Sequence, residues 1–365
     1  MSKKVTVLVS NDVEFDKRVD KTCRVWLNEG WQVEVIGVKR PYSKAIDRSY
    51  VVSRLSVGFQ KGFLFYASLQ IRLFLKLALN TTDVIWANDL DTLLPAYFWA
   101  RWRKKVIIYD SHEWFTEAEG LTGRPFVKGV WQRLEKNLIP RLKYVITVNQ
   151  SIANVYQSQY GNDWKVMRNV PMKVNHSLTP NRLSWPFPQN EKWIILQGAY
   201  IDPDRGAEEL VAAMEYLSGV HLIIAGDGRA ISQLKAITRS EKVSFLPKMP
   251  YDELRSLTVC CDLGLSIDKP VHQNYKFSLP NKVFDYAAAG IPILVSPLPE
   301  LTRLLESYGI GMFITDWQPK NIALDIERAL QHTQYESWKR NACLLSQEVN
   351  WENETIFLRD WIRSF

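Results

Sequence analysis

The sequence predicts an α/β protein with two Rossmann-like domains, each built on a doubly wound parallel sheet. Short β-branched segments alternate with helical patterns along the chain, and this rhythm stops once and then restarts. A length of 365 residues exceeds what one ordinary core accommodates, which favours two domains. We expect the two sheets to face each other across a cleft, because ligands of such sheets bind at the carboxyl ends of the strands.

Five short apolar segments predict the strands of the first domain, which we place at residues 1–172. They are Lys4–Ser10, Gln32–Val38, Asp83–Asn88, Lys105–Asp110 and Tyr144–Asn149. Helical patterns separate them, so a parallel order with both faces covered is expected.

A polar, proline-bearing segment without periodicity, residues 173–190, is typical of a connection between domains. The second domain is placed at residues 191–348, and residues 349–365 predict an amphipathic helix that returns to the first domain. Five more segments predict the second set of strands: Lys192–Gly198, Val220–Gly228, Lys242–Pro247, Leu263–Ile267 and Ile291–Ser296. The residues of the last helix expected to dock are Ile356, Leu358, Trp361 and Ile362.

Composition limits the classes of partner. The net charge of +7 and the pI near 9.0 favour an anionic partner, which includes nucleotide diphosphates, nucleic acid and anionic membranes. The basic start with a short apolar run predicts a first strand and no signal peptide, hence a cytoplasmic location. The four cysteines show no metal-binding spacing, so we expect buried free thiols at Cys23, Cys260, Cys261 and Cys343.

Two loops of the second domain carry candidate ligand-binding residues. After Gly198, a polar loop leads to Arg205 at a helix start, where free N–H groups and a guanidinium together suit a diphosphate. The alternative is that Asp204 caps this helix and Arg205 is solvated. Gly226 ends the next strand in Gly-Asp-Gly, which permits either a ligand's approach or an ordinary turn.

The most specific segment is "SLPNKVFDYAAAGIPILVSP", residues 278–297. A helix beginning near Pro280 would direct its N–H groups and Lys282 at an anion, with Asn281 beside them. Asp285, one turn further on, would accept hydrogen bonds from ribose hydroxyls. The alternative is a capped core helix with a charged face.

Six segments in order resemble a retaining GT-B glycosyltransferase of family 4. They are "SNDVEFDKRVDKTCRVWLNEGWQVEVIG", "IIYDSHEWFTE", "VITVNQSIANVYQSQYG" leading to "VMRNVP", "LQGAYIDPDRGAEELVAAM", "LIIAGDG" and "SLPNKVFDYAAAGIPILVSPLPE". The resemblance covers nearly the whole chain. It implies transfer of a sugar from a nucleoside diphosphate sugar to a hydroxyl of a saccharide or lipid-linked acceptor, with retention of configuration. It also implies a front-face mechanism without an enzyme nucleophile, and we expect no cofactor and no obligatory metal.

The resemblance assigns the second domain to the donor. Its implied contacts are Gly198, Arg205, Gly226, Ser278, Leu279, Pro280, Asn281, Lys282 and Asp285. Many members have two glutamates eight residues apart at this site, where this sequence has Phe277 and Asp285. Ala199 also stands where many members have an arginine, so more of the charge neutralisation would fall to Arg205.

In the first domain, the resemblance gives His112 a contact with the transferred sugar or the reacting centre. Glu113 would polarise the acceptor hydroxyl or orient His112, and the sequence does not decide between these roles. Asp12, Asp16 and Asp89 are assigned to the acceptor side.

Asp89 and Asp91 form an Asp-x-Asp after an apolar strand, which holds a metal in another glycosyltransferase fold. Because the second domain already supplies basic residues, we expect Asp91 to be a helix cap.

The segment Phe59–Leu79 combines aromatic and leucine residues with Lys61, Arg72 and Lys76. It predicts either an interfacial helix on anionic lipid, at the inner face of the cell membrane, or a core helix with basic ends. Two other functions are compatible with parts of this pattern. A sugar-nucleotide epimerase or another enzyme of the same fold would use the same cleft. A nucleic-acid-binding protein is disfavoured by the absence of a basic stripe in the sequence, so no nucleic-acid partner is expected.

Overall fold

The computed structural model describes residues 3–14, 16–174 and 179–365, which form two compact units. The first unit consists of Met1–Asn169 and Glu354–Phe365, and the second consists of Val170–Asn353. Residues 175–178 of the predicted linker lie outside the described residues. Phe187, in the rest of that linker, is buried in the core of the second unit, and Trp193 Nε1 donates to the Pro188 carbonyl at 2.8 Å. This part of the segment therefore packs on the second unit.

The first unit contains a seven-stranded parallel sheet in the order β3-β2-β1-β4-β5-β6-β7. Its strands are β1 (Lys4–Leu8), β2 (Gln32–Lys39), β3 (Val51–Ser56), β4 (Val84–Asn88), β5 (Val106–Ser111), β6 (Tyr144–Thr147) and β7 (Lys165–Val166). The five predicted strands are present, but β3 and β7 were not predicted. Both lie at sheet edges and are only partly buried, so their sequences lack the apolar runs of the central strands.

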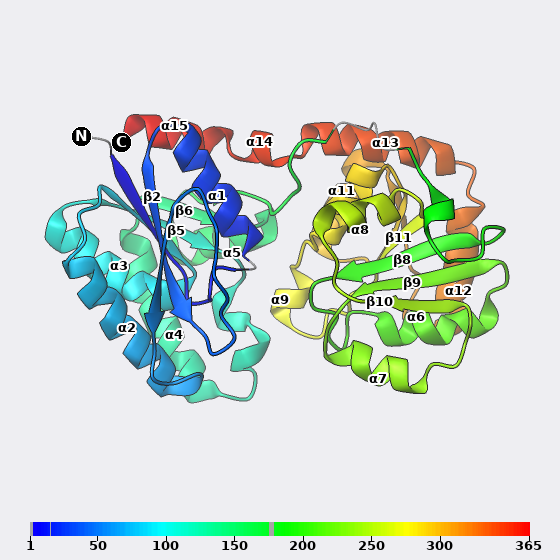
Figure 1. The fold of residues 1–365 in the computed structure, drawn as a ribbon, viewed down its shortest axis with the longest axis horizontal. Helices are drawn as coiled ribbons and strands as arrows, with labels where there is room; N and C mark the ends of the chain where they lie inside the picture. The colour runs from blue at the N-terminus through cyan, green and yellow to red at the C-terminus, as the bar shows by residue number, and fades with distance from the viewer. Residues whose placement is uncertain (1–2, 15, 175–178) are drawn as a thin grey trace. The chain divides into compact units, whose positions relative to one another are not determined.

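Helices cover both faces of this sheet. They are α1 (Lys17–Asn28), α2 (Gly62–Ala78), α3 (Leu90–Arg103), α4 (Pro125–Leu138), α5 (Gln150–Tyr160) and α15 (Ile356–Ser364). The helices α2, α3 and α4 lie on one face, and α1 and α15 lie on the other (Figure 1). Side-chain caps fix two helix starts, since Asp16 accepts from the Val19 N–H and Asn149 accepts from the Ile152 N–H.

The second unit contains a six-stranded parallel sheet in the order β10-β9-β8-β11-β12-β13. Its strands are β8 (Lys192–Gly198), β9 (Val220–Gly226), β10 (Val243–Leu246), β11 (Leu263–Ser266), β12 (Ile293–Val295) and β13 (Gly311–Phe313). The five predicted strands are again present, and β13 was missed because it is a three-residue edge strand.

Two apolar cores flank the second sheet. One lies under α6, α7 and α12, and the other lies under α8, α10, α11 and α13. The helices are α6 (Ala207–Ala213), α7 (Arg229–Ile237), α8 (Tyr251–Thr258), α9 (Gln273–Lys276), α10 (Lys282–Ala289), α11 (Pro299–Tyr308), α12 (Pro319–Leu330), α13 (Tyr335–Glu348) and α14 (Trp351–Glu354). Two of these helices end in left-handed glycine, α10 at Gly290 with φ of 70° and α11 at Gly309 with φ of 58°.

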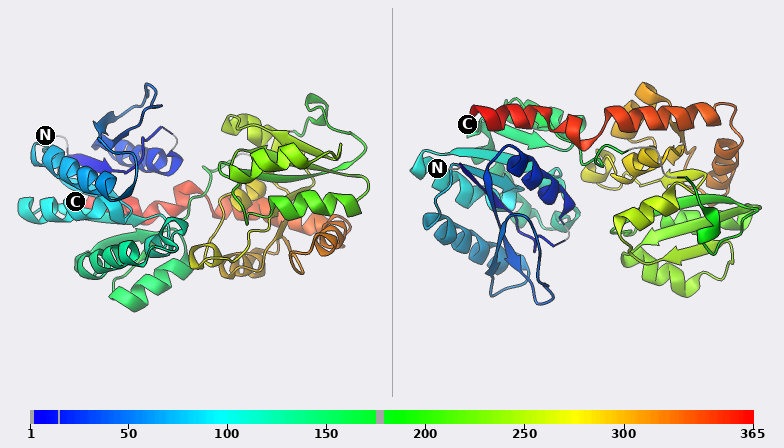
Figure 2. Two further views of the ribbon diagram at one scale, coloured as in Figure 1. Left: turned by 90° about the horizontal axis from the view of Figure 1, so that it is seen from below. Right: turned by 45° about the horizontal axis from the view of Figure 1, so that its top comes forward.

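Residues 354–365 return to the first unit, as Figures 1 and 2 both show. The predicted single helix is in fact two, because α14 ends at Glu354 and α15 begins at Ile356. Leu358 and Ile362 are buried, whereas Ile356 is 53% exposed, so its expected docking role was wrong. The chain end adds an aromatic contact in which the Phe365 ring stacks on Trp26 with centroids 6.3 Å apart.

All four cysteines are free thiols; three are buried, and Cys343, against expectation, is partly exposed. Among the described residues, none of the helices combines the length and the apolar character needed to span a membrane.

Candidate functional site

The loops at the carboxyl end of the second sheet bring two predicted cations to one buried carboxylate. Arg205 Nη1 lies 2.9 Å from Asp268 Oδ1, and Lys282 Nζ lies 3.5 Å from Asp268 Oδ2. Asp268 follows β11 and is fully buried, and its Oδ2 also accepts from Ser266 Oγ at 3.0 Å. Arg205 and Lys282 are therefore members of one cluster, although they come from different loops.

The cluster carries one negative and two positive charges. Burial alone would raise the pKa of Asp268, but Lys282 and Arg205 bring it below its usual value, so the carboxylate is ionised. Burial lowers the pKa of Lys282, and Asp268 opposes this effect. The Arg205 guanidinium also lies over the Tyr275 ring, 4.0 Å from its centroid. A solvated Arg205 is thus excluded, and the net positive charge suits a diphosphate.

The start of α10 contributes less to anion binding than expected. The helix begins at Lys282 with Asn281 in the N-cap position. The N–H groups of Val283 and Phe284 donate to the carbonyls of Pro280 and Asn281, at 3.2 and 3.0 Å. Because these first-turn amides already have partners, the positive charge of this site comes mainly from side chains. Leu279 and Ser278 precede the helix, and Ser278 Oγ donates to the Tyr275 carbonyl at 2.8 Å.

Asp285 lies on α10, one turn after Lys282, and its side chain contacts the end of β8. Its carboxylate accepts from Gln197 Nε2 at 3.3 Å and from Tyr251 Oη at 3.2 Å. Gln197 is itself fixed, since its Oε1 accepts from Thr258 Oγ1 at 2.9 Å. These two contacts fix the orientation of the Asp285 carboxylate.

The glycines of the two loops serve backbone packing. A Cβ at Gly226, where φ is 142°, would lie 1.8 Å from the Gly198 carbonyl oxygen. The adjacent loops are joined by a hydrogen bond from the Ile201 N–H to the Asp227 carbonyl, at 2.7 Å. The turn interpretation of Gly-Asp-Gly therefore accounts for Gly226. The residue in the N-cap position of α6 is Gly206, so the alternative in which Asp204 caps that helix is wrong.

In the first unit, His112 lies after the carboxyl end of β5 between two carboxylates. Its Nδ1 lies 3.6 Å from Asp89 Oδ2, and its Nε2 lies 3.3 Å from Asp110 Oδ2. The His112 N–H also donates to Asp89 Oδ1 at 2.8 Å. Asp89 adopts a positive φ of 57°, a strained conformation for a residue with a Cβ, and such strain often marks a functional position.

Asp110 is tied to a buried arginine that was not predicted as a site residue. Arg18 Nη2 lies 2.7 Å from Asp110 Oδ1, and Arg18 Nε lies 3.2 Å from Oδ2, a two-pronged contact. Arg18 Nη1 donates to the Met167 carbonyl at 2.7 Å. The sequence did carry a signal, because Arg18, Thr22 and Val25 follow helical spacing on the buried face of α1.

The other predicted residues of the first unit have structural partners. Asp12 accepts from Ser43 Oγ at 2.8 Å and from the Glu14 N–H at 2.9 Å, and Asp16 caps α1. Ser111 Oγ donates to the carbonyl of Glu113 at 2.7 Å. These contacts fix the backbone around the carboxyl end of the sheet.

The expectation that Asp91 caps a helix was wrong, because Asp89 is in the N-cap position of α3 and Asp91 lies buried in the first turn. Burial and the neighbouring Asp89 raise the pKa of Asp91 to about 7. Within the described part of the chain, no group of three or more His, Cys, Asp and Glu side chains has a geometry that could hold a metal ion.

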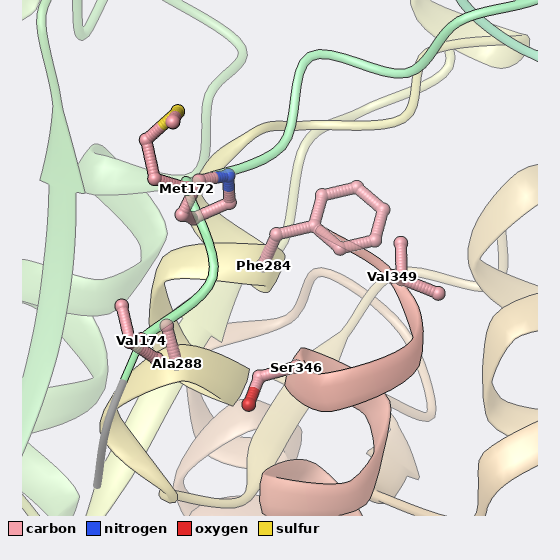
Figure 3. Close-up of a pocket in the computed structure, with 7 residues that line it drawn as sticks. Met172, Val174, Phe284, Ala288, Ser346 and Val349 are labelled. Carbon is pink, nitrogen blue, oxygen red and sulfur yellow. The ribbon is translucent and has the colours of Figure 1, made fainter. Parts of the chain in front are cut away.

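An apolar hollow lies between the segment Pro171–Val174, α10 and α13 (Figure 3). None of the predicted site residues lines it. The residues around it are Pro171, Met172, Val174, Phe284, Ala288, Ser346 and Val349.

The two Rossmann-like units, each with polar side chains at the carboxyl edge of its sheet, are the α/β architecture of GT-B glycosyltransferases. Residues 17–177 match the model of Glycosyltransferase Family 4, and residues 191–332 match that of glycosyl transferases group 1. Together the two matches cover more than half of the chain. The protein therefore belongs to the glycosyltransferases. No curated protein shows a significant sequence match to it.

Solved structures share this fold over the whole chain. Sucrose-phosphate synthase from Thermosynechococcus elongatus has a TM-score of 0.80 at 15% identity, covering 99% of this chain and 98% of that one. HepE from Anabaena, in complex with UDP and glucose, has a TM-score of 0.70 at 15% identity, with both chains fully covered. WaaG, a glycosyltransferase involved in lipopolysaccharide biosynthesis, has a TM-score of 0.68 at 14% identity, covering 99% and 100% of the two chains.

Proposed function

We propose that this glycosyltransferase transfers a sugar from a nucleoside diphosphate sugar to a hydroxyl of a saccharide or lipid-linked acceptor. The observation that carries the proposal is the pairing of Arg205 and Lys282 around Asp268, close in sequence to the ordered Asp285. Departure of the diphosphate builds negative charge on its oxygens, and prearranged cations stabilise that charge. The presence of UDP and glucose in the complex of the similar HepE supports a uridine nucleotide as the first donor to test.

The proposed reaction retains the anomeric configuration and needs no metal. Arg205 and Lys282 would neutralise the leaving diphosphate, and Asp285 would bind the ribose. The acceptor hydroxyl would attack the anomeric carbon on the face from which the diphosphate leaves, so the enzyme would need no nucleophile. A leaving phosphate oxygen would take the proton of that hydroxyl. Proton NMR of the first product tests retention, and an inverted anomer contradicts it. Activity that vanishes in chelator and returns only with Mg²⁺ or Mn²⁺ contradicts metal independence.

Calorimetric titration with UDP tests the two cations. Each charge-assisted hydrogen bond contributes about 1.5–3 kcal/mol, so Arg205→Ala and Lys282→Ala should each weaken UDP binding about 10- to 100-fold. Arg340→Ala, at an exposed position of α13 in the same unit, is the matched control. Wild-type affinity and turnover in both site variants would refute the assignment.

The outer face of α2 favours a lipid-linked acceptor. The helix packs inward through Phe65, Leu69, Leu73 and Leu77. Its exposed face is also apolar and is formed by Phe63, Leu64, Ile71, Phe74 and Leu75. A monomer seldom leaves so many large apolar side chains together in water, which marks the face as an interaction surface. The inner face fits a core helix, and the outer face supports the interfacial interpretation that we propose.

Basic residues accompany this apolar face. Lys61 and Arg72 are exposed, and Lys76 is partly exposed, as anionic lipid headgroups require. We therefore infer a peripheral contact with anionic membrane at its cytoplasmic side. Sedimentation with phosphatidylglycerol vesicles should capture the wild type and release Phe63→Asp/Leu75→Asp, whereas Leu344→Asp on α13 should still bind. Equal sedimentation of all three proteins, or no binding at low salt, would remove this proposal.

A further inference from the structure

The surroundings of His112 determine how many protons its ring carries. Each of its two ring nitrogens faces a carboxylate oxygen, with Nδ1 3.6 Å from Asp89 and Nε2 3.3 Å from Asp110. A neutral imidazole has one N–H, so one nitrogen would present its lone pair to a carboxylate. Only the doubly protonated ring places a positive charge between the two carboxylates and turns an N–H toward each of them.

The Asp110 carboxylate cannot turn away from His112, because Arg18 holds it from the other side. Asp110 and Arg18 are both buried, and the guanidinium contacts both carboxylate oxygens. The Arg18 contact with the Met167 carbonyl anchors the guanidinium in turn. Three side chains from α1 and the end of β5 therefore form a fixed row in the order Arg18, Asp110, His112.

We propose that His112 is an imidazolium at neutral pH and acts as a fixed positive charge, not as a proton acceptor. Asp110 maintains this state, and Arg18 is a positioning residue that holds the Asp110 carboxylate in place. The inference rests on the proposed function only for the step in which that charge is used. It explains how the enzyme keeps a cation on the acceptor-side unit, and it separates His112 from any general-base role, which requires a neutral ring.

The carboxylates around the ring favour the protonated state, whereas the positive charge of Arg18 lowers the pKa of His112 and opposes it. The charged groups facing this cluster are Asp110 and Glu113 next to His112 in the chain, Asp89 and Asp91 at the start of α3, and Asp16 and Arg18 at the start of α1. Burial lowers the pKa of His112, but the neighbouring Asp89 and Asp110 outweigh it and raise the pKa to about 9. Burial would raise the pKa of Asp110, but Arg18 and His112 lower it to about 2.

Nitrogen-detected NMR of the imidazole rings tests the inference on the free enzyme without any substrate. The His112 signals, assigned with His112→Gln, should remain those of an imidazolium up to about pH 8. His221 is an internal reference in the same spectra, because burial lowers its pKa and it should become neutral first. A His112 ring that loses its proton near pH 6.5 overturns the inference and leaves the proposed function untouched.

Variants separate positioning from charge. Asp110→Asn should lower the His112 transition by more than one pH unit, and Asp89→Asn provides the same test if the first variant does not fold. Asp163→Asn, at an exposed site in the same unit, should leave the transition unchanged. Arg18→Lys keeps the charge but loses the two-pronged contact, so it should reduce kcat at least tenfold with UDP affinity unchanged. Wild-type kcat in Arg18→Lys overturns the positioning role, whereas a protonated His112 in an enzyme without transferase activity overturns only the proposed function.

Discussion

Arg205 and Lys282 contact opposite oxygens of one carboxylate, that of the buried Asp268. The two cations come from loops that follow β8 and β11, 77 positions apart in the numbering. The two positive charges repel each other, and the carboxylate between them keeps both side chains in place before a ligand arrives. A bound diphosphate would take over part of that role.

This competition predicts opposite effects of Asp268→Asn on folding and on binding. Breaking a buried ion pair from one side costs about 3–5 kcal/mol of folding stability. Without the negative charge of Asp268, Arg205 and Lys282 should attract the UDP diphosphate more strongly. Saturating UDP should therefore raise the melting temperature more in Asp268→Asn than in the wild type. Differential scanning fluorimetry with and without UDP measures both effects. A smaller UDP shift in the variant would show that Asp268 aims the cations and does not compete with phosphate.

Gly226→Ala should destabilise the second unit by more than about 3 kcal/mol. The added Cβ would meet the Gly198 carbonyl at 1.8 Å, and φ of 142° is unfavourable for alanine. Gly219→Ala is the matched control, because Gly219 has a positive φ of 67° but open space around the added Cβ, so only about 1 kcal/mol should be lost. Urea unfolding measures the difference. Equal losses in the two variants would mean that the contact between the loops relaxes at little cost.

Leu358→Ala should destabilise the first unit by about 2–5 kcal/mol, because it opens a cavity where the leucine is fully buried. Ile356→Ala, on the same helix but 53% exposed, should change the stability by less than about 0.5 kcal/mol. Equilibrium unfolding followed by tryptophan fluorescence provides the measurement. A negligible effect of Leu358→Ala would show that α15 contributes little to the core of the first unit.

The burial of Glu135 predicts that the stability of the protein depends on pH. It is 1% exposed, and although Tyr160 Oη donates to its Oε2 at 3.0 Å, burial raises its pKa to about 7. The carboxyl of the unfolded chain loses its proton near pH 4.5, whereas the folded chain keeps it up to about pH 7. Between these pH values ionisation stabilises only the unfolded state, so the free energy of unfolding falls by about 3 kcal/mol.

Glu135→Gln should remove this fall. The free energies of unfolding at pH 5 and pH 8 should therefore lie closer together in Glu135→Gln than in the wild type. Glu306→Gln, at an exposed position of α11, should keep the wild-type difference. An unchanged difference in Glu135→Gln would mean that Glu135 is ionised at both pH values.

The fold was predictable where burial dictates composition. Central strands of a parallel sheet are buried on both faces, so β1, β4 and β8 appear as apolar runs in the sequence. The edge strands β3 and β13 bury one face or less, and their residues are not distinctive. The break at Thr355 was also missed, because amphipathic spacing continues across it.

The site was predictable only for residues with a local signature. Lys282 stands at a helix start and Arg205 follows a strand, so each had a positional argument. Asp268 had no such local signature. Only the folded loops around it distinguish this buried aspartate from the many other acidic residues of the chain. Arg18 differs, since its spacing with Thr22 on α1 placed it on the buried face, and a buried arginine requires an anionic partner.

The return of residues 354–365 to the first unit has a consequence for biosynthesis. The second unit is one continuous stretch, so it can complete its tertiary structure as soon as residue 353 has left the ribosome. The first unit is still missing α15 at that time and exposes the apolar surface around Trp26 that Phe365 later covers. The unit translated earlier is therefore the one that is completed last.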